Sequence, residues 1–210
     1  MDEAQRQLSD QIDQATQRLL GTARVITEPD LRAPSLLPGW TRAHVLAHLA
    51  RGADAMRNLL ASVRTGQDRP VRASAGARQA DIEHTAGLRA NELVADLADS
   101  AMALRRVARQ LDGAGWQVPV RIMDSAPFPA AQLLTRRLVE VELHHCDLGA
   151  GYTPADWPPP FATMELGEPM RSQRADRLNS TRVAEPLAPL RPPAPYRPNQ
   201  RLPGSWLGTR

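Results

Sequence analysis

The chain has 210 residues, a formal net charge of +3 and one cysteine, which is enough for one domain of ordinary size plus an extension. It contains no apolar run near the roughly 18 residues needed to span a membrane, and its polar, acidic start is not a signal peptide. A single cysteine excludes an internal disulfide and fits a reducing compartment, so we expect a cytoplasmic protein.

The excess of positive charge lies in the last 50 residues of the chain. Residues 161–210 hold eight Arg and four Asp or Glu, so the preceding residues are close to neutral. A nucleic-acid-binding protein needs a basic face on its folded part. We therefore expect neither a nucleic acid nor a membrane as a partner.

Hydrophobic periodicity predicts the first three of four main helices. Apolar residues recur at spacings of three and four over residues 2–26. A connection punctuated by prolines over 27–39 leads to a second helix, which begins at the N-cap Thr41 and runs to about Arg64. After a loop over 66–76, residues 77–111 are helical again, and Gly87 is expected to divide them into a short and a long piece.

The fourth helix follows an irregular stretch over 113–129, within which residues 116–122 could form a short strand. Residues 130–148 contain neither Gly nor Pro, and Gly149 and Gly151 are expected to end the helix. The predicted fold class is therefore all-α, in outline a four-helix bundle.

The character of the chain changes after Trp157. Three consecutive prolines at 158–160 are followed by eight more up to Pro203. This part has no hydrophobic period and cannot bury enough apolar surface to offset its ordering entropy. We expect a bundle domain over residues 1–157 and a Pro/Arg-rich tail over 158–210, irregular or disordered from about Glu168 onward.

Two candidate metal ligands lie one turn apart on the fourth helix. Glu140 and His144 project within roughly 40° of each other, beside an apolar stripe that turns them toward the bundle interior. A carboxylate and an imidazole at this spacing can hold one divalent ion. A buried carboxylate also needs a partner, which favours a cation over a mere charge on the helix flank.

The second helix offers a third ligand, since a catalytic zinc site usually has three protein ligands and one open position. Helical geometry places His48 at the edge of the apolar stripe and His44 about 40° further toward solvent. We prefer His48. Two alternatives stay open: His44 and His48 binding together as an i,i+4 pair, or His48 as a satisfied core histidine.

Three neighbours on the fourth helix are expected to lie outside the metal site. His145 follows His144 at about 100° around the helix and falls on the apolar stripe, so we expect a structural role. Cys146 is expected to be a packed, inert thiol. Glu142 points roughly opposite the ligand pair and is expected to be solvated.

Two further residues have open roles. Asp147 lies within one turn of His144 and could orient this ligand from behind or cap the helix. Arg137 lies on the ligand face, where it could meet an anionic substrate or pair with Glu140 or another acid.

Two stretches of the chain resemble a known family. LPGWTRAHVLAHLARGADAMRNLL (37–60) and EVELHHCDLGAGYTPADW (140–157) are similar to the hallmark stretches of the mycothiol-dependent maleylpyruvate isomerase family, which belongs to the DinB/YfiT-like metalloenzymes. The resemblance runs from the first helix to about Ala162. It implies a DinB-like four-helix bundle that holds one divalent ion, usually zinc, with His48, Glu140 and His144 as ligands.

The resemblance also implies the chemistry. In the family, the thiol of mycothiol binds the metal as thiolate, adds to the cis double bond of maleylpyruvate, and is eliminated after rotation to give fumarylpyruvate. Other relatives resemble thiol transferases. The expected cofactors are therefore Zn²⁺, or another divalent first-row metal, and mycothiol. The expected partners are a small-molecule thiol and a small organic acid.

The end of the chain departs from the family. Relatives continue into a second α/β domain that closes over the site, whereas this chain becomes rich in Pro and Arg. That departure looks like a truncation or a change of reading frame. A non-catalytic metal-binding bundle, or a truncated and inactive family member, is therefore the alternative to an enzyme.

Overall fold

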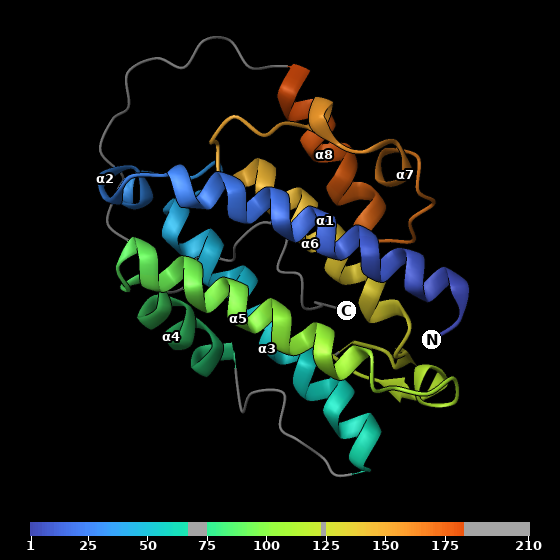
Figure 1. Ribbon diagram of the computed structural model, residues 1–210. Coiled ribbons are helices and arrows are strands. Elements are labelled where there is room, and N and C mark those ends of the chain that lie inside the picture. Colours follow the sequence, from blue (N-terminus) through green and yellow to red (C-terminus); the bar gives the residue numbers. More distant parts are fainter. Residues whose placement is uncertain (67–74, 123–124, 183–210) are drawn as a thin grey trace.

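The computed structural model describes residues 1–66, 75–122 and 125–182. Within these ranges four long helices lie side by side as a bundle (Figure 1): α1 (Glu3–Val25), α3 (Arg42–Thr65), α5 (Ala90–Ala108) and α6 (Gln132–Asp147). The fold is an all-α four-helix bundle, so the predicted fold class is confirmed. None of the helices in the described ranges is both long enough and apolar enough to cross a membrane.

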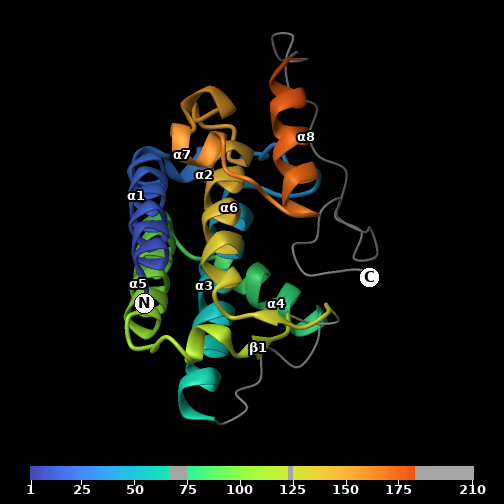
Figure 2. The ribbon, with the colours of Figure 1, turned by 90° about the vertical axis from the view of Figure 1, so that its right-hand side faces the viewer.

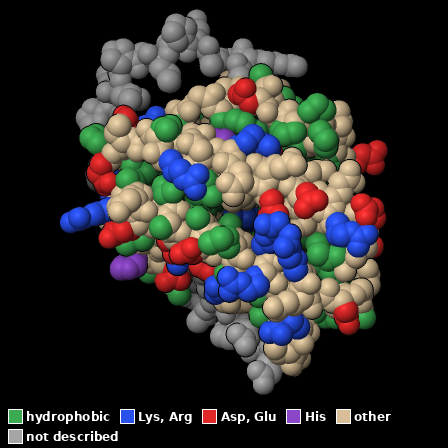
Figure 3. Space-filling view, viewed as in Figure 1, with side chains coloured by type: hydrophobic (Ala, Val, Ile, Leu, Met, Phe, Trp, Pro, Cys, Tyr) green, Lys and Arg blue, Asp and Glu red, His purple; other side chains and the backbone are tan. Residues whose placement is uncertain are grey.

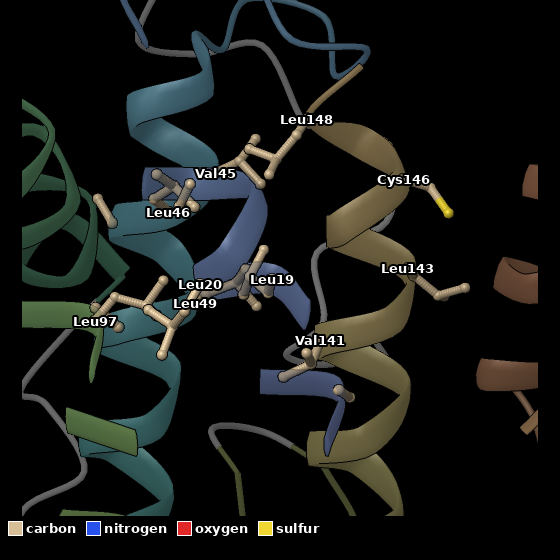
Figure 4. Close-up of a cluster of buried hydrophobic side chains, with 14 of the residues drawn as sticks. Leu19, Leu20, Val45, Leu46, Leu49, Leu97, Val141, Leu143, Cys146 and Leu148 are labelled. Atoms are coloured by element: carbon tan, nitrogen blue, oxygen red, sulfur yellow. The ribbon is translucent and has the colours of Figure 1, made fainter. Parts of the chain in front are cut away.

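The four helices close a ring around a core that consists of two hydrophobic clusters. α1 and α3 each pack against both α5 and α6, and Figure 2 shows α1 and α5 on one side of the molecule with α3 and α6 beside them. Figure 4 shows leucines of α1, α3 and α5 and Val141 of α6 in the space between the helices. Amphipathic helices bury their apolar stripes in this way, so the core predicted from the 3.6-residue period is formed.

Shorter elements complete the described chain. They are α2 (Glu28–Arg32), α4 (Ala75–Ala86), the 3-10 helices η1 (Gly115–Gln117) and η2 (Pro154–Asp156), the strands β1 (Pro119–Val120) and β2 (Phe128–Pro129), α7 (Pro159–Ala162) and α8 (Met170–Arg182). β1 pairs with β2 antiparallel, with Val120 opposite Phe128. The predicted short strand and the predicted break at Gly87 are therefore confirmed. The central part of the predicted loop over 66–76 lies outside the described residues.

Local signals set the ends of the helices that carry the site. Thr41 caps α3, because its hydroxyl accepts a hydrogen bond from the backbone N–H of His44. Gly149, with φ of +60°, follows the end of α6 in the left-handed conformation that favours glycine. Sequence analysis did not predict α2, which lies inside the predicted connection. Thr27 caps this helix, and Pro29 lies in its first turn, where proline is tolerated.

The expectation of irregular chain from about Glu168 is wrong for residues 170–182. These residues form α8, which packs against α6 (Figure 2). Arg174 donates a hydrogen bond to the carbonyl of Phe161, and Arg177 pairs with Asp147. Tertiary contacts of this kind override weak periodicity. Residues 183–210 lie outside the described residues.

Candidate metal centre

The three candidate ligands come together in the bundle interior. His48 lies on α3, and Glu140 and His144 lie one turn apart on α6. Each residue is only 3% exposed, so the predicted orientation of α6 is confirmed. The Nε2 atom of His48 is 3.5 Å from Oε1 of Glu140, and the rings of His48 and His144 meet edge to face with centres 4.8 Å apart.

The donor set has the chemistry of a zinc site. Two ligand atoms on a tetrahedral zinc ion lie about 3.3 Å apart when each bond is about 2.0–2.1 Å, and the separation of His48 Nε2 from Glu140 Oε1 is close to that value. As the side chains stand, no group of three or more His, Cys, Asp and Glu residues in the described ranges could hold a metal ion. Ligation by all three residues therefore requires a side-chain adjustment.

Asp147 is placed to orient His144. Its Oδ2 atom lies 2.8 Å from Nδ1 of His144, and Arg177 of α8 donates two hydrogen bonds to the same carboxylate. Burial alone would raise the pKa of Asp147, but the hydrogen bonds from His144 and Arg177 lower it below its usual value. The Asp147 carboxylate contacts His144 and Arg177, whereas the last turn of α6 is closed by the backbone N–H of Leu148. These contacts fit the predicted orientation of the candidate ligand.

Arg137 pairs with the candidate carboxylate. Its Nη1 atom donates to Oε2 of Glu140 at 2.9 Å and to the backbone carbonyl of Leu49 at 2.8 Å. Both charged side chains are almost fully buried. Arg137 holds the carboxylate through Oε2. The other oxygen, Oε1, faces the imidazole of His48.

His44 is directed away from the ligand group. Its Nδ1 atom lies 2.6 Å from the Thr41 hydroxyl, and its Nε2 atom lies 3.0 Å from Oε2 of Glu83 on α4. The helical phase argument predicted this difference between His44 and His48. The alternative of a paired His44–His48 site therefore has no support from the geometry.

One contact of His48 opposes metal binding as the site stands. The Nη2 atom of Arg78, on α4, lies 2.9 Å from Nδ1 of His48. A guanidinium can only donate hydrogen bonds, so Nδ1 must accept, and a neutral His48 then carries its proton on Nε2. That tautomer directs an N–H toward Glu140, where a metal ion needs a lone pair.

His145 and Cys146 are structural. His145 stacks on the ring of Tyr152 and meets the Thr22 hydroxyl through Nε2 at 2.7 Å. Burial, with Arg18 nearby, lowers the pKa of His145 to about 4, so the ring is neutral at pH 7. Burial raises the pKa of Cys146 to about 12, and Figure 4 shows its sulfur on the side of α6 away from α3. The thiol is buried, as predicted, and its inertness stays a prediction.

The expectation that Glu142 is solvated is wrong. Its side chain is 1% exposed and pairs with Arg18 of α1 at 2.6 Å. The hydroxyl of Tyr152 donates to its other oxygen, also at 2.6 Å. Sequence reasoning assumed that the side of α6 opposite the ligands faces water, but α1 and the segment after α6 cover it.

Three residues that shape the site were missed from the sequence. A Cβ atom at Gly52 would lie 2.5 Å from Oε1 of Glu140, so α3 needs glycine where this carboxylate approaches. A lone glycine inside a helical pattern is a signal that could have found it. Arg78 and Arg177 carry no such local signal, because each acts on a residue of a distant helix.

The part of the chain that carries the candidate ligands matches a known family. The family model described as the mycothiol maleylpyruvate isomerase N-terminal domain matches residues 12–149, which include all three candidate ligands. The chain belongs to this family. A search of curated proteins gave no match.

Two solved structures of the isomerase family resemble the chain. One is the mycothiol-dependent maleylpyruvate isomerase, with 28% sequence identity, and the other is a histidine-to-alanine variant of such an isomerase, with 27%. Each superposes with a TM-score of 0.71 and covers 75% of this chain. The chain spans 65% of the length of each, less than two thirds.

Proposed function

We propose that the chain binds one divalent ion through His48, Glu140 and His144 and works with mycothiol as a thiol enzyme. The observation that carries this proposal is the buried convergence of the three side chains within the part that matches the family. Two nitrogens and one carboxylate oxygen suit zinc and leave a fourth position open. Another divalent first-row ion can replace zinc, since affinity alone does not select the metal.

The chain's own residues prepare the site for that ion. Asp147 accepts a hydrogen bond from Nδ1 of His144, which leaves Nε2 as the ligating nitrogen. Arg137 fixes one oxygen of Glu140 and leaves the other beside His48. When bound, the metal would lower the pKa of a coordinated thiol and fix its position.

The reaction type follows from the family. We propose a mycothiol-dependent isomerisation of the maleylpyruvate type, or a thiol transfer. Held at the metal that His48, Glu140 and His144 would bind, the thiol would supply a nucleophile that adds reversibly to the conjugated alkene, which would permit rotation about that bond. The partners are then a small-molecule thiol and a small organic acid. The division into residues 1–157 and 158–210 and a cytoplasmic location stay predictions.

Turnover of maleylpyruvate by zinc-loaded protein tests this function. We expect product only when mycothiol is present, and we expect His48→Ala to lose activity while His44→Ala keeps it. Turnover without mycothiol would contradict the thiol mechanism. Absence of turnover in protein that carries its metal would favour the alternative, a non-catalytic metal-binding bundle or inactive family member.

Replacing Arg78 should strengthen zinc binding, because Arg78→Ala removes a cation beside the ion and frees Nδ1 of His48 to carry the proton. We expect about a tenfold gain in zinc affinity, the scale on which partners behind the ligands act. Competition with a chromogenic chelator measures it. The matched control is Gln79→Ala on the same helix, whose side chain contacts Glu83 and not the site. Unchanged zinc binding by Arg78→Ala would show that Arg78 does not oppose the metal ion. Weaker zinc binding would show that Arg78 supports the metal-bound state.

A further inference from the structure

A cavity of about 380 Å³ lies next to Arg137. It lies between α1 and α5, with residues of α3 and α6 completing its wall, and none of the three candidate ligands lines it. Its lining is mostly apolar and includes Ile12, Leu20, Met56, Leu60, Met102 and Leu133. A cavity of this size and lining is typical of a small-molecule site.

Arg137 brings a buried hydrogen-bond donor to the wall of this cavity. The residue is 1% exposed and lines the cavity. Its Nη1 atom serves Glu140 and Leu49, whereas Nη2 is buried and has no hydrogen-bond partner among the described residues. A buried donor left unsatisfied carries a free-energy penalty, which is larger when the group is charged. A ligand acceptor in the cavity would remove that penalty.

The charges around the cavity favour an anion. Its lining contains Arg24, Arg105 and Arg137 and one acid, Asp13. Asp13 pairs with Arg105 at 2.7 Å and Arg137 pairs with Glu140, so Arg24 supplies the net positive charge. Figure 3, which looks onto α1 and α5, shows basic side chains gathered where these two helices lie side by side. A cationic ligand would meet this excess of positive charge unfavourably.

We propose that this cavity binds a small carboxylate with an apolar body, such as a medium-chain fatty acid. The carboxylate would accept a charge-assisted hydrogen bond from Nη2 of Arg137, and the hydrocarbon chain would lie among the apolar side chains. Maleylpyruvate fits this site poorly, because it has two carboxylates and no apolar body, and one carboxylate would be buried without a partner. The cavity is therefore distinct from the proposed thiol-enzyme site.

Calorimetric titration of the full chain with octanoate tests the proposal. We expect saturable binding at one site, about tenfold or more tighter than 1-octanol, as a charge-assisted hydrogen bond of about 1.5–3 kcal/mol requires. Octylammonium should bind more weakly than both octanoate and 1-octanol. Arg137→Met should reduce octanoate affinity to that of octanol, with circular dichroism used to check that this variant is folded.

Because Arg137 also pairs with Glu140, its replacement affects the candidate metal site as well as the cavity. A second variant therefore tests the cavity without changing Arg137. Ala101 lines the cavity, and Ala101→Leu should fill it and abolish octanoate binding. Ala95→Leu, at an exposed position of the same helix outside the cavity lining, is the matched control and should bind normally. Equal affinity for octanoate and octanol would overturn the proposal, as would octanoate binding that Ala101→Leu leaves unchanged.

Discussion

Replacing either imidazole of the candidate metal centre, in His48→Ala or His144→Ala, is expected to reduce bound zinc from about one ion per chain to below about a tenth. Each substitution leaves two of three ligands, and a two-ligand site loses most of its affinity because the remaining positions must be filled by water. Glu140→Gln should weaken binding less completely, since an amide oxygen remains but the negative charge that helps neutralise the ion is lost. Metal analysis after zinc reconstitution and desalting measures all three.

Two histidines provide matched controls for this experiment. His44→Ala and His145→Ala should both keep the metal, because His44 faces Thr41 and Glu83 and His145 faces Thr22. Loss of zinc from His44→Ala, with retention by His48→Ala, would show that the phase argument for α3 is wrong. If the parent protein is metal-free after reconstitution, the candidate metal site is wrong, and so is the proposed function.

Gly52→Ala is expected to abolish zinc binding while the protein stays folded. The new Cβ atom would lie 2.5 Å from Oε1 and 3.0 Å from Oε2 of Glu140, so the carboxylate must move. Movement breaks the approach of Oε1 to His48 and strains the bond that Oε2 accepts from Arg137. The helix itself tolerates the change, since alanine in a helix interior is favoured over glycine by about 1 kcal/mol.

The matched control for this substitution is Gly21→Ala in α1. A Cβ atom at Gly21 would meet no atom within 4 Å, so we expect normal metal content and a gain of about 1 kcal/mol in the free energy of unfolding. Chemical denaturation and metal analysis of both variants separate the two effects. Full zinc occupancy in Gly52→Ala would mean that Glu140 does not ligate from the position it holds in this structure.

The site is also tied to a part of the chain outside the bundle. Arg177 of α8 pairs with Asp147, and Asp147 in turn contacts His144. The positive charge of Arg177, on α8, therefore helps to orient the candidate ligand His144 through Asp147. The proposed metal site therefore involves α8 as well as the matched region over residues 12–149.

Most of the fold could be predicted from the sequence because its signals are local. The 3.6-residue period marks the long helices, Thr41 marks the start of α3, and Gly149 marks the end of α6. The same period turned Glu140 and His144 inward and separated His48 from His44. These features depend only on helix geometry and on which faces are apolar.

Other features depended on which helix covers which face, and the sequence by itself could not decide them. Glu142 has the same angular position on α6 whether that face is exposed to water or covered. Only the packing of α1 beside it buries Glu142 and pairs it with Arg18. The contact between Arg78 and His48 and the pairing of Arg177 with Asp147 join residues 30 positions apart. Local periodicity contains no information on such contacts, because they arise from the tertiary arrangement of helices whose own sequences fix only their inward and outward faces.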